Sequence, residues 1–223
     1  MSEQQPDAAM IAVLELGQVD AGEFAAWYDT EHLPERRSVP GILTARRWLS
    51  TSEPATSVAF YDLHGLETLE SADYRAISGP HLSPWSRRII EASADFRYYE
   101  VRRLTGDPRP SAEEATGFYV VGMNVEDSFD AELNAWWDEE HLPRLSAVPG
   151  VLRARRFVAV EGPHRYLAVD DLASPDVVGS PPWMSAAETP WTHRVRPRTS
   201  DRFKLVCRRP HPHAATHARG GTR

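Results

Sequence analysis

Two segments of this sequence are nearly the same, and this repeat limits the fold more than any other feature. Residues 27–47 read WYDTEHLPERRSVPGILTARR and residues 136–156 read WWDEEHLPRLSAVPGVLRARR, with 13 of 21 positions identical at an offset of 109. Residues 61–63 match 170–172 at the same offset, and residues 84–88 match 190–194 at an offset of 106. Self-similarity at a fixed spacing indicates a duplicated structural unit. The chain is therefore predicted to contain two copies of one fold.

The repeat also predicts how the chain of 223 residues is divided. We expect a first copy in residues 1–106, a linker in 107–115, a second copy in 116–209 and a disordered tail in 210–223. The region around the linker is rich in proline and polar residues, which is typical of a domain boundary. Each copy is long enough to bury a core, and pairing the two copies would enlarge that core.

Both copies show the same order of predicted elements. In the first copy, short apolar or alternating runs predict strands at 9–16, 42–50, 56–64 and 95–104. Apolar residues at helical spacing predict helices at 20–33 and 66–93, and Pro34 is expected to tighten or end the first of them. The second copy repeats the order with strands at 116–125, 151–160, 165–172 and 201–209. The order β-α-β-β-α-β is the ferredoxin-like plan.

A single ferredoxin-like copy covers only one face of its sheet with helices, so the other face needs a partner. Two copies in one chain meet this need when they pack open face to open face. The predicted fold class is α+β, with two tandem ferredoxin-like copies forming an intramolecular barrel. We expect a cavity between the two sheets.

Composition excludes several classes of function. The formal net charge of −7 argues against a protein that binds nucleic acid through its charge. One cysteine, Cys207, leaves no disulfide framework or cysteine-rich zinc site. No apolar run reaches the roughly 18 residues of a membrane span, and the N-terminus does not read as a signal peptide. We expect a cytoplasmic protein, monomeric or homodimeric, with no metal, membrane or nucleic-acid partner.

Histidines are the first candidates for catalysis. His32 and His141 occupy the same place in the two copies, just before Leu-Pro, and each follows an aromatic residue by four positions. Such a histidine can titrate near neutral pH and act as an acid or base. It can equally cap a helix C-terminus, so both roles stay open. Together with His32, Tyr61 and His81 make the polar residues of the first copy resemble an acid–base set, so the predicted catalytic residues are His32, Tyr61, His81 and His141.

Strand alternation predicts which side chains line the cavity between the sheets. On the strand at 42–50, Arg46 and Trp48 are placed on the cavity face, and Arg155 occupies the position of Arg46 in the second copy. A buried arginine facing a carboxylate can also be only a structural ion pair. The predicted substrate-binding residues are Glu15, Tyr28, Arg46, Trp48, Trp85, Asn124, Arg155, Tyr166 and Asp170.

The repeated WxDxEHLP segment with its following VPG and ARR resembles the EthD-like branch of the dimeric α+β barrel superfamily. The resemblance covers both copies and implies a barrel in which one chain supplies the two halves that relatives supply from two chains. Relatives across the superfamily include cofactor-free monooxygenases, polyketide cyclases, muconolactone-type isomerases and haem-handling proteins. The resemblance implies the fold much more closely than the activity.

The combined hypothesis is a cofactor-independent enzyme of the cyclase, isomerase, dehydratase or lyase type. It would act by acid–base chemistry on a small aromatic or conjugated, polyketide-like anion. In this hypothesis His32 is the general acid or base, Tyr61 donates to a developing oxyanion and Arg46 holds a carboxylate or enolate. The alternatives are a non-catalytic small-molecule binding protein and a cofactor-free or haem-dependent monooxygenase.

Overall fold

The structure is a computed structural model, which describes residues 5–52 and 56–210. It contains two halves with the same order of strands and similarly placed helices, and it confirms the predicted α+β fold. The first half consists of β1 (Ala8–Glu15), α1 (Ala21–Trp27), α2 (Leu33–Arg37), β2 (Ile42–Ser50), β3 (Thr56–Leu63), α3 (Glu67–Glu70), α4 (Ala72–Arg75), α5 (Pro84–Ala92) and β4 (Asp95–Gly106). The second half consists of β5 (Gly117–Val125), α6 (Asp130–Trp136), α7 (Leu142–Ser146), β6 (Val151–Glu161), β7 (Tyr166–Leu172), α8 (Pro181–Ala187), α9 (Pro190–Val195) and β8 (Thr199–Arg208).

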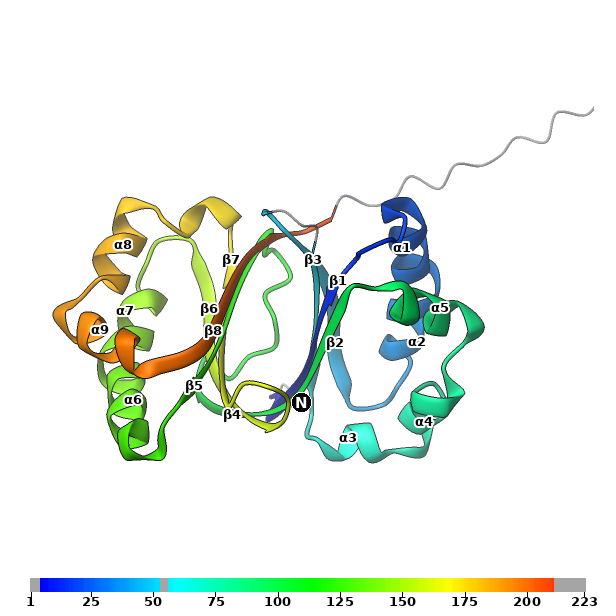
Figure 1. Ribbon diagram of the computed structural model, residues 1–223, viewed down its shortest axis with the longest axis horizontal. Coiled ribbons are helices and arrows are strands. Elements are labelled where there is room, and N and C mark those ends of the chain that lie inside the picture. The colour runs from blue at the N-terminus through cyan, green and yellow to red at the C-terminus, as the bar shows by residue number, and fades with distance from the viewer. Residues whose placement is uncertain (1–4, 53–55, 211–223) are drawn as a thin grey trace, which may run out of the picture.

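The strands of both halves form one closed antiparallel barrel in the order β1-β3-β2-β8-β5-β7-β6-β4. The halves join where β4 pairs with β6 and, more briefly, where Leu49 and Ser50 of β2 pair with Arg208 and Cys207 of β8. The helices of each half lie outside the barrel against its own sheet (Figure 1). Each half therefore buries one sheet face against its helices and the other against the opposite half.

The interior of the barrel is a packed core, which corrects the expectation of a cavity between the sheets. Fully or almost fully buried side chains from both halves meet there, among them Phe60, Phe118, Phe157 and Val169. Trp48 points inward as predicted, and its ring stacks on Phe118 with centroids 5.2 Å apart. An eight-stranded barrel is just wide enough for side chains to fill. Side chains from the two sheets therefore fill the space between them, where the sequence predicted a cavity.

The faces of β3 and β7 are the reverse of those predicted. Phe60 and Val169 lie inside the barrel, whereas Tyr61, Tyr166 and Ala168 pack in the clusters under the helices. Asp170 alternates with Val169 and so shares the helix side with Tyr166. Hydrophobicity could not distinguish the faces, because the barrel interior and the helix-facing layer are equally apolar.

Arg155 lies at one end of the barrel interior and holds an ion-pair network together. Its guanidinium donates to Asp62 at 2.5 Å and to Asp171 at 3.1 Å, and all three side chains are nearly or completely buried. The same two carboxylates accept the main-chain N–H groups of Ser111 and Ala112. Arg155 is 0% exposed and has no free face for a ligand. The prediction that it binds substrate is wrong, and the structural alternative accounts for it.

Arg46 occupies the equivalent position on β2, opposite Phe60, as Arg155 lies opposite Val169 on β6. Its guanidinium donates to the main-chain oxygens of Ser111, Ala112 and Glu113. The segment between the halves, residues 111–113, therefore lies at the end of the barrel interior, and Ala112 is buried there. Arg46 holds this segment, in contrast to its predicted role in binding a carboxylate or enolate.

The EHLP segment forms an unusual turn in each half. Residues Tyr28–His32 and Trp137–His141 are π-helical, with N–H groups bonding to the carbonyl five residues earlier, and α2 and α7 continue directly from them. Proline lacks an N–H and its ring clashes with the carbonyl four residues before it. The turn before Pro34 therefore widens, whereas the sequence predicted that it would tighten or end.

The VPG segment then ends each helix. Gly41 and Gly150 both have φ of +94°, a conformation that L side chains rarely adopt, and they direct the chain into β2 and β6. The predicted disordered tail lies, apart from Pro210, outside the described residues. Within the described residues, no helix is long and apolar enough to cross a membrane.

Candidate functional site

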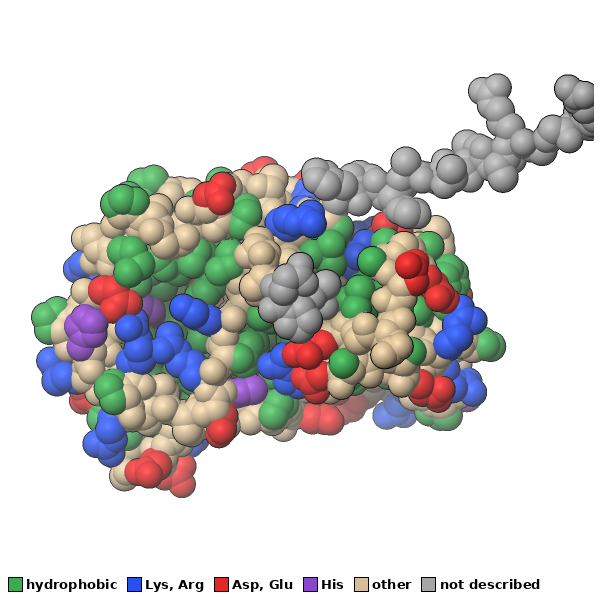
Figure 2. All heavy atoms as spheres, turned by 45° about the horizontal axis from the view of Figure 1, so that its top comes forward, with side chains coloured by type: hydrophobic (Ala, Val, Ile, Leu, Met, Phe, Trp, Pro, Cys, Tyr) green, Lys and Arg blue, Asp and Glu red, His purple; other side chains and the backbone are tan. Residues whose placement is uncertain are grey.

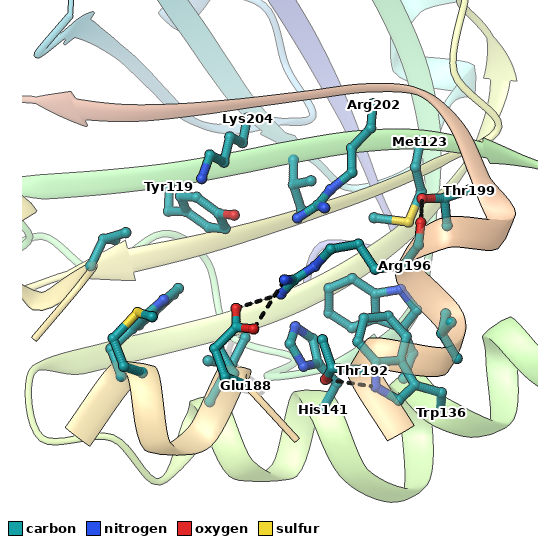
Figure 3. A pocket seen from close by; sticks show the side chains of 18 of the residues that line it. Tyr119, Met123, Trp136, His141, Glu188, Thr192, Arg196, Thr199, Arg202 and Lys204 are labelled. Carbon is teal, nitrogen blue, oxygen red and sulfur yellow. Dashed lines mark hydrogen bonds and ion pairs between the residues drawn. The ribbon is translucent and has the colours of Figure 1, made fainter. Parts of the chain in front are cut away.

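A pocket of about 200 Å³ opens between the sheet and the helices of the second half (Figure 3). Strands β5 and β8 supply one wall, and α6 to α9 with the π-turn supply the other. A cavity of about 150 Å³ accommodates benzene, so this pocket has room for one or two aromatic rings. Its lining comprises Tyr119, Val121, Met123, Trp136, Trp137, His141, Leu145, Val178, Gly179, Trp183, Met184, Ala187, Glu188, Thr192, Val195, Arg196, Thr199, Arg202, Lys204 and Val206.

Aromatic rings form the floor of this pocket. The rings of Trp136 and His141 stack with centroids 4.1 Å apart, and Trp137 meets the same imidazole edge-on at 4.7 Å. The Trp136 indole N–H donates to Thr192 of α9, which ties α6 to α9 within the helical wall. Tyr119 packs edge-on against Trp183 at 5.3 Å. These contacts hold the rings in fixed orientations, and an aromatic ligand can stack on or pack edge-on against them.

His141 is a neutral imidazole at neutral pH. Burial lowers its pKa to about 3, and the nearby charges of Arg196 and Arg202 add to the effect. Its Nδ1 atom is buried and has no hydrogen-bond partner among the described residues. The helix continues past His141 as α7, so the imidazole does not cap a helix end. The capping alternative is excluded, and a neutral hydrogen-bonding group faces the pocket.

The mouth of the pocket is cationic. Figure 2 shows blue side chains gathered around an apolar hollow on this half of the molecule. Arg196 pairs with Glu188 through two hydrogen bonds of 3.0 and 2.6 Å, whereas Arg202 and Lys204 have no carboxylate within ion-pair distance in residues 5–52 and 56–210. Figure 3 shows the Arg202 side chain directed toward Arg196 and the Lys204 side chain ending beside Tyr119. The mouth can therefore attract and hold an anion.

A neutral phenol and a neutral carboxyl lie beside this mouth. Burial raises the pKa of Tyr119 to about 12, although Arg202 and Arg196 oppose the effect. Its strand partner Asp170 is completely buried, and burial together with the neighbouring charge of Asp171 raises the pKa of Asp170 to about 8. Asp170 is not a lining residue, and it acts on the pocket only through Tyr119.

The shifted Asp170 predicts how stability depends on pH. Since the folded-state pKa of about 8 lies above the unfolded value near 3.9, the folded protein holds a proton that the unfolded chain loses between these pH values. The contribution of Asp170 to stability should therefore fall as pH rises from about 4 to 8. Urea unfolding of Asp170→Asn should show a variant more stable than the wild type at pH 8, with the advantage disappearing near pH 4. Parallel profiles for the two proteins would contradict this prediction.

The region of the first half that corresponds to the second-half pocket contains different side chains. His32 is buried against Trp27 and Tyr28, and burial, together with Arg36, lowers its pKa to about 3. At offset 109, Arg36 replaces Leu145 of the pocket. At offset 106, Phe96 and Tyr98 replace the pocket cations of β8, so the first half lacks the cationic mouth.

The remaining predicted residues are not brought together at one site. Tyr61 interacts with Tyr28 under the helices of the first half, and His81 is exposed on the turn Gly79–His81. Asn124 donates to the main chain of Pro163 and to Asp201 at the end of β5. Glu15 lies near Arg97, Trp85 donates to Glu23, and Tyr166 donates to Asp130. Of the four predicted catalytic residues, only His141 lines the pocket.

Sequence reasoning missed Tyr119, Trp183, Glu188, Arg196, Arg202 and Lys204 as pocket residues. The sequence contains one feature that points to Arg202 and Lys204 as pocket residues. Arg202 and Lys204 stand where the first copy has Phe96 and Tyr98, so a comparison of the last strands would have shown charge gained in one copy only.

A metal ion and a haem each place specific requirements on the residues of such a pocket. No cluster of three metal-ligating side chains occurs in residues 5–52 and 56–210. An axial haem ligand needs open space for a four-pyrrole ring beside its imidazole. His141 is 8% exposed and packed between two tryptophans, beside a cavity of about 200 Å³. These residues do not fit a haem.

No protein-family profile and no curated protein sequence matches the chain. Solved structures do match it. An anthrone oxidase-like protein has a TM-score of 0.67 at 10% identity, with 94% of each chain covered. A candidate monooxygenase from Lactobacillus acidophilus has a TM-score of 0.61 at 11% identity, with 92% of this chain and 94% of that chain covered. A chlorite dismutase from Candidatus Nitrospira defluvii has a TM-score of 0.59 at 11% identity, with 95% and 93% covered. The chain thus has the fold of the dimeric α+β barrel proteins.

Proposed function

We propose that this chain is an enzyme that binds one small aromatic anion in the second-half pocket and acts on it by cofactor-independent acid–base chemistry. One observation carries the proposal. A neutral imidazole and an aromatic floor lie beneath a mouth where Arg202 and Lys204 lack carboxylate partners among the described residues. Arginine and lysine bind carboxylates and enolates through charge-assisted hydrogen bonds. The aromatic ring of the ligand would stack on the pocket floor, and its anionic group would remain at the mouth beside the cations.

The neutral state of His141 suits this chemistry. Burial is the main cause of the lowered pKa of His141, and the charges of Arg196 and Arg202 come second. An anion held by Arg202 and Lys204 offsets this second cause and so makes the bound imidazole a stronger base. His141 would then take a proton from an acidic carbon or hydroxyl of the ligand. The same cations would stabilise the resulting enolate or phenolate as charge develops. Removal of a proton next to a conjugated system is the step shared by cyclisation, isomerisation and elimination.

The cations give the direct test of ligand binding. Arg202→Gln combined with Lys204→Gln should weaken the binding of benzoate-like and naphthoate-like acids by about 100-fold or more, because each of the two charge-assisted bonds contributes roughly 1.5–3 kcal/mol. Titration calorimetry measures the affinity and should give one ligand per chain in the wild type. Arg208→Gln, further along β8 and outside the pocket, is the matched control and should leave affinity unchanged. Equal binding of acids and their neutral amides would contradict the proposal.

Oxidative chemistry is the second candidate, because two of the similar structures are named as a candidate monooxygenase and an anthrone oxidase-like protein. An enolate formed at His141 can react with dioxygen, which would be the co-substrate. Incubation of the bound acid with the protein in an oxygen electrode distinguishes the candidates. Oxygen uptake supports oxygenation, turnover without uptake supports proton-transfer chemistry, and tight binding without turnover supports a binding protein.

A further inference from the structure

The first half contains a buried cation, Arg36, that forms no ion pair with the described residues. Arg36 is 4% exposed, and its Nε and Nη1 atoms are buried without hydrogen-bond partners. It forms no ion pair with any carboxylate in residues 5–52 and 56–210. Its guanidinium carbon lies 5.0 Å from the centroid of the Tyr74 ring, and the partly exposed carboxylate of its chain neighbour Glu35 acts on it electrostatically without forming an ion pair. An unpaired buried charge costs several kcal/mol, so a partner for this guanidinium is required.

The buried side chains around Arg36 are neutral. Burial raises the pKa of Tyr28 to about 12 and that of Tyr61 well above its usual range, although Arg36 opposes both shifts. Both tyrosines are therefore neutral and act as hydrogen-bond donors. His32 lies four residues before Arg36 on the same helix face, and its buried Nδ1 has no partner among the described residues. Neutral donors thus surround an uncompensated cation.

We propose that Arg36 and His32 form a second ligand site, which binds one small monovalent anion such as a halide, nitrate or formate. Unpaired N–H groups on a buried guanidinium, with neutral hydroxyl and imidazole groups beside them, are the donors that such an anion needs. Arg36 is 4% exposed, so only a ligand of a few atoms could lie beside its guanidinium. The second half has Leu145 at the equivalent position, so this site belongs to the first half alone.

Anion-dependent stability tests the site in the full chain. At constant ionic strength in a gluconate buffer, adding chloride, bromide, nitrate or formate should raise Tm along a saturating curve. The expected rise is about 3 to 6 °C when the anion reaches about ten times its dissociation constant. Arg36→Met should abolish this rise, and it should leave the gluconate-buffer Tm equal to or above that of the wild type. Arg37→Met, which removes a neighbouring exposed arginine, should retain the full response.

A bromide-soaked crystal of the wild type provides a test that does not depend on how a variant folds. Anomalous scattering should place a bromide beside the Arg36 guanidinium. An ordered water there in place of bromide, or the same anion response in Arg36→Met as in the wild type, would overturn the proposal. Because the mouth of the second half can also hold anions, the stability series is run in the Arg202→Gln, Lys204→Gln background, where a rise in Tm that Arg36→Met abolishes belongs to Arg36. The bromide position in the crystal separates the two sites directly, so neither outcome depends on the proposed enzyme activity.

Discussion

His141→Phe is expected to reduce turnover of the bound aromatic acid by 10² to 10⁴-fold, the usual loss when a positioned acid–base group is removed. Phenylalanine keeps a ring of similar size against Trp136, so the stacked floor should survive. Binding of the acid should persist, because Arg202 and Lys204 remain. The measurement is kcat and KM for the acid that calorimetry identifies, together with Tm for each protein.

His32→Phe is the matched control, since His32 has the same place in the repeat and similar aromatic neighbours, and it lies outside the pocket. It should leave kcat nearly unchanged. In the free enzyme His141 is already neutral above about pH 4, so the profile of kcat/KM should show no histidine inflection near pH 6.5. Equal rate losses in the two variants, or an unchanged rate in His141→Phe, would refute the role of His141.

Arg155→Met is expected to lower the free energy of unfolding by about 3–5 kcal/mol, the range observed when one partner of a buried ion pair is removed. The substitution leaves Asp62 and Asp171 buried inside the barrel without their shared cation. Burial already raises the pKa of Asp171, an effect that Arg155 opposes, so the loss of Arg155 raises this pKa further. The loss of stability should therefore be larger at pH 8 than at pH 5. Denaturant unfolding at the two pH values measures both effects.

Two further variants distinguish charge from packing. Arg155→Met combined with Asp62→Asn and Asp171→Asn removes the uncompensated charges and should recover a large part of the lost stability. Arg46→Met should cost less than Arg155→Met, because Arg46 bonds only to main-chain oxygens and lies partly exposed. A triple variant as unstable as Arg155→Met alone would show that the size of the side chain, and not its charge, is what matters.

The sequence by itself determined the order of elements and the closed architecture. The repeat at offset 109 and the alternation of strand and helix patterns predict eight strands in two equivalent sets, and the barrel contains those eight. A sheet with one uncovered apolar face must pair with another, so the inward position of Trp48 follows from strand alternation on β2. The equivalence of His32 with His141 and of Arg46 with Arg155 was likewise visible in the residues.

Tertiary structure alone decided where the pocket lies and which half contains it. Apolar residues occupy both faces of β3 and β7, so composition could not tell the barrel interior from the layer under the helices, and Tyr61 and Asp170 were assigned to the wrong face. The interior is closed by Phe60, Phe118 and Phe157, while the space under the helices depends on single replacements between the halves. Where the second half has Leu145, the first has Arg36, and where the first has Tyr98, the second has Lys204. These exchanges change volume and charge without changing the strand or helix pattern, because periodicity records which face a residue occupies and not how much room its neighbours leave.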